Sequence, residues 1–70
     1  MTELVFEIRD AEEGGYHARA LGKAIFTQAE DWQSLKFNIL EAISVFYDAP
    51  AEQPKLVTLH YVWEEFLTVQ

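Results

Sequence analysis

Hydrophobic and polar residues alternate along the first third of the chain, which is the pattern of half-buried β-strands. Leu4, Phe6 and Ile8 fall on one side of the first alternating segment. An acidic stretch that ends in two glycines, residues 10–15, follows it and predicts a hairpin connection. Three sequential strands with short links form an antiparallel meander. We predict these strands over residues 3–9, 16–21 and 24–27.

The spacing of apolar residues then changes to that of a helix, predicted over residues 32–47. Asp31 is the predicted N-cap, because its carboxylate can accept hydrogen bonds from the open amides of the first turn. Two prolines within residues 48–54 predict that the helix has ended there. The apolar stripe expected to face the sheet comprises Trp32, Leu35, Ile39, Ala42, Ile43 and Phe46, widened by Leu40 and Tyr47.

The last clear strand is predicted over residues 56–63. It is apolar at nearly every position, which suggests a strand covered on both faces. Residues 66–69 fit either a further short strand or a pairing arm. The whole chain, residues 1–70, is therefore expected to be a single α+β domain of the order β-β-β-α-β, with one helix on one face of an antiparallel or mixed sheet.

One helix covers one face of a sheet, so the opposite face must meet water or another chain. The residues expected on that face are Val5, Leu21, Ile25 and one set from the last strand. Because a solvated face needs fewer apolar residues than this, we predict a homodimer or homotetramer. Phe37 lies off the helical stripe and fits either a cover over a loop or an interface contact. Trp63 has the same two interpretations. The candidate interface residues are thus Leu21, Ile25, Phe37 and Trp63.

Composition narrows the possible functions. Half of the 70 residues are hydrophobic. None is cysteine, which excludes a stabilising disulfide and a metal site with thiolate ligands. Twelve acids against five bases give a net charge of −7, which opposes nucleic-acid binding and favours a basic protein partner. We find no apolar run long enough for a membrane span and no signal-peptide pattern in the sequence, so we expect a cytoplasmic protein.

Candidate chemistry is sparse. His17 and His60 could pair at a metal, but two histidines without an identifiable third ligand are more typical of ordinary strand positions. The many carboxylates are more typical of a solvated surface than of an acid–base pair, which needs a cleft. The sequence contains neither a nucleophile elbow nor a glycine-rich phosphate loop. We therefore expect no catalytic residue, no bound metal and no cofactor.

Three ordered motifs resemble those of HicB-like antitoxin domains. Residues 13–19, Glu-Gly-Gly-Tyr-His-Ala-Arg, resemble the start of that family's second strand. Residues 26–35 look like its passage from the third strand into the helix, and Asn38-Ile39-Leu40-Glu41-Ala42-Ile43 looks like the helix that follows. The resemblance covers about residues 3–48. It implies a partial ribonuclease-H-like fold and a module that sequesters a small basic mRNA-cleaving protein of the HicA type.

The chain departs from the family pattern at residues 21–25, where the family's usual turn is replaced by Leu-Gly-Lys-Ala-Ile. Full-length antitoxins also carry a DNA-binding domain, which these 70 residues lack, so the chain resembles short stand-alone members and direct nucleic-acid binding is not expected.

The leading hypothesis is therefore a non-catalytic module that lays an acidic hairpin across a basic partner. The candidate partner-binding residues are Glu12, Glu13, Gly14, Gly15, Gly22 and Lys23. The alternative is a regulatory domain that binds a small molecule between subunits, in a pocket lined by Trp32, Phe37, Tyr47 and Trp63. An enzyme is the third and least favoured hypothesis.

Overall fold

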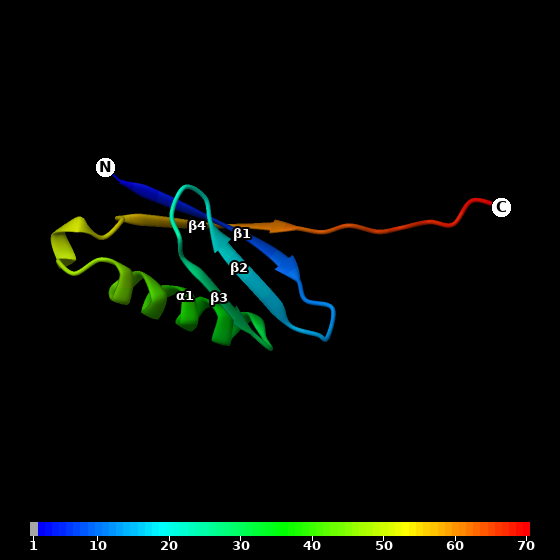
Figure 1. Cartoon of the computed structure of the whole chain (residues 1–70), viewed down its shortest axis with the longest axis horizontal. Coiled ribbons are helices and arrows are strands. Elements are labelled where there is room, and N and C mark those ends of the chain that lie inside the picture. The colour runs from blue at the N-terminus through cyan, green and yellow to red at the C-terminus, as the bar shows by residue number, and fades with distance from the viewer. Residues whose placement is uncertain (1) are drawn as a thin grey trace.

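The computed structural model describes residues 2–70 and confirms the α+β class, with a four-stranded mixed sheet and one long helix (Figure 1). Strand β4 pairs parallel to β1, whereas β2 pairs antiparallel with both β1 and β3. The strands therefore lie in the order β3-β2-β1-β4. The elements are β1 (Glu3–Asp10), β2 (Tyr16–Ala20), β3 (Phe26–Ala29), α1 (Trp32–Phe46), a 3-10 turn (Pro50–Glu52) and β4 (Leu56–Val62).

The core lies between the sheet and α1. The alternation of β1 places Leu4, Phe6 and Ile8 toward the helix, as predicted, and Phe6 and Ile8 are fully buried. Across from them, the helix contributes three buried residues at helical spacing, Leu35, Ile39 and Ile43. Small side chains on β2, those of Ala18 and Ala20, complete this layer and let the helix approach the sheet. Among residues 2–70, no polar or charged residue is buried, so the core is held by apolar packing.

The helix begins as predicted at the Asp31 cap. The Asp31 carboxylate accepts a hydrogen bond from the backbone N–H of Ser34 at 2.8 Å, which satisfies one of the open amides of the first turn. The helix ends at Phe46, one residue earlier than predicted, with Tyr47 as its C-cap. Its buried stripe is narrower than the sequence suggested, because Leu40 is 62% exposed.

The third strand lies two residues later than predicted, at Phe26–Ala29 instead of residues 24–27. Residues 21–25 are used by the turn, in which Gly22 has a φ of +86° and the Ala20 amide donates to the Ile25 carbonyl. Ile25 is consequently buried in the core, at 4% exposure. The prediction that Ile25 lies on the open face and contributes to an interface was therefore wrong.

Strand β4 is an edge strand, and the expectation that both its faces are covered is wrong within the chain. Val57 and Leu59 pack against the core, whereas Leu56 on the other face is 47% exposed. Beyond β4, residues 63–70 form no strand within the chain and run away from the body as an extended arm (Figure 1).

Candidate functional site

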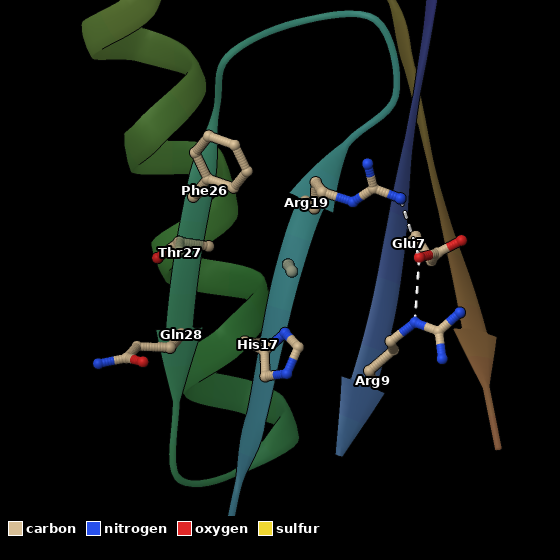
Figure 2. A pocket seen from close by; sticks show the side chains of 8 residues that line it. Glu7, Arg9, His17, Arg19, Phe26, Thr27 and Gln28 are labelled. Atoms are coloured by element: carbon tan, nitrogen blue, oxygen red, sulfur yellow. Dashed lines mark hydrogen bonds and ion pairs between the residues drawn. The ribbon is translucent and has the colours of Figure 1, made fainter. Parts of the chain in front are cut away.

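The sheet face opposite α1, called the open face below, carries an ion network at its centre. Glu7 on β1 lies directly opposite Arg19 on β2, and Arg9 follows two residues along β1 on the same face. The Glu7 carboxylate accepts hydrogen bonds from Arg9 Nε at 3.1 Å and from Arg19 Nη2 at 3.2 Å (Figure 2). The bond from Arg9, followed by that from Arg19, holds the pKa of Glu7 below its ordinary value. Glu7 is therefore poorly suited to act as a general base near neutral pH.

A shallow hollow of about 530 Å³ surrounds this network. His17, Phe26 and Gln28 line it together with the two arginines, and Phe26 is 68% exposed (Figure 2). Two guanidinium groups and the Glu7 carboxylate line the hollow, and Arg9 is also paired with Glu64, so the charges of this network are balanced. Exposed arginine beside an exposed aromatic ring is the chemistry of a protein-contact surface. The open face is thus mixed in character, and less apolar than predicted.

A second surface is formed where two loops meet at the C-terminal end of β1. The turn 11–15 lies against the connection from β3 to α1, and a groove of about 510 Å³ lies between Glu13 and Glu30. Gly15, with a φ of +82°, makes the closest approach, since a Cβ there would lie 2.5 Å from the Ala29 carbonyl oxygen. These loops contain neither lysine nor arginine. We call this surface the acidic end; its carboxylates are Asp10, Glu12, Glu13, Glu30 and Asp31.

The structure separates the predicted partner-binding residues into two groups. Glu12, Glu13, Gly14 and Gly15 lie at the acidic end. Gly22 and Lys23 lie in the β2–β3 turn, at the opposite end of β2. The two groups therefore do not form one continuous contact surface.

The structure does not gather the four aromatic residues of the alternative ligand-binding hypothesis. Trp32 instead packs edge-on against Tyr16 and Tyr61, with ring centroids 5.3 and 6.0 Å away. Tyr47 packs against Phe46, while Phe37 is 65% exposed on the helix. Trp32 and Tyr47 thus pack at opposite ends of α1, and the four residues do not line a shared pocket.

The two histidines lie on the open face but on different strands. His17 is on β2 and His60 is on β4, with β1 between them. Within residues 2–70, no three His, Asp or Glu side chains are placed to hold a metal ion. In the same range, no helix is long and apolar enough to cross a membrane.

Sequence reasoning missed the Glu7–Arg19 pair and the hydrogen bond from the Tyr61 hydroxyl to Asp10, 2.7 Å long. The Glu7–Arg19 pair could have been predicted from the sequence. The five-residue turn between Asp10 and Tyr16 sets the hairpin register and places Glu7 opposite Arg19. The hydrogen bond between Tyr61 and Asp10 joins residues 51 positions apart, and it depends on the parallel pairing of β4 with β1.

This hydrogen bond predicts an unusual alkaline titration. The bond to Asp10, aided by partial desolvation, raises the pKa of Tyr61 to about 12. Because the folded state favours the protonated hydroxyl, its stabilising contribution is present below about pH 10 and is lost as the pH rises toward about 12. Ultraviolet titration of tyrosinate should show one late transition, which Tyr61→Phe removes and Asp10→Asn moves to lower pH. If Asp10→Asn leaves the transition in place, the hydrogen bond is not its cause.

Comparison with known proteins gives two curated relatives. A UPF0150 protein of Thermotoga maritima is 33% identical over 67 residues, which cover 96% of this chain and 93% of the relative. A UPF0150 protein of Archaeoglobus fulgidus is 38% identical over 53 residues, covering 76% and 77% of the two chains. No family model matches the sequence. No solved structure matches it either.

Proposed function

We propose, from the premise that this chain belongs to the UPF0150 family, that it is a non-catalytic, cytoplasmic HicB-like module that binds a small basic protein. The partner would be a protein such as a HicA-like mRNA interferase, and binding would occlude its active site. The acidic end is the observation that carries this proposal. It brings carboxylates from two loops to one end of the molecule, with no lysine or arginine in either loop.

The acidic end is suited to such a partner in its charge and its shape. Glu12, Glu13 and Glu30 are exposed, and no hydrogen bond or ion pair within the described chain engages their carboxylates. The groove between the loops offers a concave surface beside them. Clustered charge of one sign accelerates encounter with a partner of the opposite sign and orients it. The rest of the domain, on this proposal, holds the two loops together.

Charge reversal tests this assignment. We expect Glu12→Lys with Glu13→Lys to weaken binding of a HicA-like interferase at least about tenfold, mainly through a slower association rate. Glu41→Lys with Glu52→Lys is the matched control, because both residues are exposed and lie away from the acidic end. Each replacement adds two charge units, so both double variants change the net charge from −7 to −3.

The measurement is calorimetric titration of the interferase with each variant at low and at physiological salt. The proposal expects the control to bind within about twofold of the wild-type chain, and wild-type binding to weaken as salt rises. Equal weakening by both double variants would show that only net charge matters. Tight binding by the Glu12, Glu13 variant would place the contact elsewhere.

A further inference from the structure

The outer edge of β4 is open and has none of the usual protection against pairing. Residues 56–62 contain no Lys, Arg, Asp, Glu, Pro or Gly, although edge strands are commonly shielded by charge, proline or a bulge. The other edge of the sheet is better covered. Strand β3 has only four residues, and the Asn38 side chain of α1 donates to its Gln28 carbonyl at 2.9 Å. The outer edge of β4 is therefore the edge of the sheet at which a further strand can pair.

The arm, residues 63–70, continues in the direction of β4 and is largely free of the body (Figure 1). Its apolar side chains are exposed: Trp63 63%, Phe66 87%, Leu67 80% and Val69 92%.

The arm preserves the alternation of β4. Arg9 on the open face donates to Glu64 at 3.1 Å, and Phe66 lines an open-face hollow with Arg9 and Val62. Even-numbered arm residues thus follow the open face. Leu67 and Val69 consequently fall on the helix side, in line with Val57 and Leu59.

An apolar groove runs along that helix side, between α1 and β4. It encloses about 180 Å³ and is lined by Lys36, Ile39, Leu40, Val57 and Leu59. Leu40, a large apolar residue on the helix, is left 62% exposed beside it. A strand added to the edge of β4 would place alternate side chains over this groove.

We propose that two copies of this chain exchange their arms, so that residues 64–70 of each copy add an antiparallel strand to β4 of the other. The pairing is centred on Trp63, which meets its own symmetry mate. In this register Leu67 lies opposite Leu59 and Val69 opposite Val57 of the other copy, and both enter the groove beside Leu40. On the open face, Thr68 lies opposite Thr58, a favourable cross-strand pair.

The side-chain pattern favours this register. Residues 64–70 pair with all seven residues of β4, so every residue of the edge finds a partner. A slip of one residue would turn Leu67 and Val69 away from the groove and place Thr68 over it. The loss of this apolar burial is what fixes the register of a half-buried sheet.

The arm carries much of the apolar surface that a second copy would cover. Trp63 and Phe66 together represent roughly 300–500 Å² of side-chain surface per arm. Leu67, Val69 and the groove residues add to this, and a specific interface needs about 800 Å² per partner. Of the two acids beside the centre, Glu64 is paired with Arg9 of its own chain, and Glu65 falls opposite Tyr61 of the other copy.

Solution mass gives the first test. Light scattering should show twice the 8.1 kDa of one chain, and Leu67→Asp with Val69→Asp should reduce it to the mass of one chain. Ser44→Asp with Val45→Asp is the matched control; it adds the same two charges at exposed positions of α1 that lie outside the groove and the arm, and should stay dimeric. Circular dichroism should be native for all variants, since these side chains are exposed in the single chain. A monomeric wild-type chain would overturn the proposal.

Cross-linking tests the register, and the absence of native cysteine makes it unambiguous. The chain carrying both Thr58→Cys and Thr68→Cys should oxidise to a covalent dimer. Each single variant should stay uncross-linked, because equivalent residues of the two copies are about 33 Å apart in this register. A disulfide within one chain would mean that the arm folds back on its own β4. A dimer that does not cross-link would mean that another surface holds it. Either result would overturn the proposal.

This inference stands apart from the proposed function. The arm variants keep the acidic end, and the Glu12, Glu13 variants keep the arm. A monomeric wild-type chain that still binds the interferase overturns only the arm exchange. A dimeric wild-type chain that does not bind the interferase overturns only the proposed function.

Discussion

Replacement of Phe6 by alanine is expected to remove about 3–5 kcal/mol from the free energy of unfolding. The Phe6 side chain is fully buried at the centre of β1, between the sheet and α1. Truncation would leave a cavity that the regular backbone of a central strand cannot collapse to fill. The total free energy of unfolding of a small domain is only about 5–15 kcal/mol. We therefore expect a protein that is close to unfolding at room temperature.

Phe37→Ala is the control for this loss. It deletes the same atoms from a side chain that is 65% exposed on the helix, and should change stability by less than about 0.5 kcal/mol. Urea denaturation followed by circular dichroism, at matched protein concentration, compares the two variants. Equal losses from both would contradict the core assignment of Phe6. A large loss from Phe37→Ala alone would show that Phe37 is covered in the assembled protein.

Gly15→Ala is expected to have the second large effect, a loss of about 2–5 kcal/mol from the free energy of unfolding. The positive φ of +82° costs roughly 1–2 kcal/mol for a residue with a Cβ. The added Cβ would also lie 2.5 Å from the Ala29 carbonyl oxygen and 2.9 Å from the Glu30 Cα, which are backbone atoms. Relief of this overlap must push the two loops of the acidic end apart, at a further cost of about 1–3 kcal/mol.

Gly22→Ala separates these two contributions. Gly22 has nearly the same φ, +86°, but a Cβ there would meet nothing within 4 Å. The Gly22→Ala variant should therefore lose only about 1–2 kcal/mol of stability, which is the cost of backbone strain at this φ. Thermal unfolding of both variants gives the difference, which measures the contact between the loops. If Gly15→Ala is no worse than Gly22→Ala, the two loops are not packed as described.

The parts of the fold that could be predicted from the sequence are those set by local pattern. The alternation of Leu4, Phe6 and Ile8 and the capping chemistry of Asp31 required no knowledge of distant neighbours. Strand β3 was misplaced because the turn before it uses Ile25 as a core residue, and a short apolar run does not reveal where a turn ends. Pairing between β1 and β4, residues 3–9 with 56–62, depends on tertiary contacts across the whole chain.

The candidate site was predictable in its residues but not in its geometry. The acidic turn was visible in the sequence, but its contact with the connection before α1 depends on the fit of Gly15 against Ala29. Likewise, the apolar character of residues 56–63 was evident, and it suggested a strand covered on both faces. In the single chain this strand lies at an edge, and its apolar residues remain partly exposed. The arm-exchange proposal accounts for that difference through a second copy.

The proposed silencing of a basic partner, by covering of its active site, is tested most directly by RNA cleavage. A HicA-like interferase is mixed with increasing amounts of the chain, and cleavage of a defined RNA is measured. The account predicts inhibition that is complete near stoichiometric amounts, and weaker inhibition by the Glu12→Lys, Glu13→Lys variant than by its Glu41→Lys, Glu52→Lys control. Undiminished cleavage in the presence of excess chain would contradict the account.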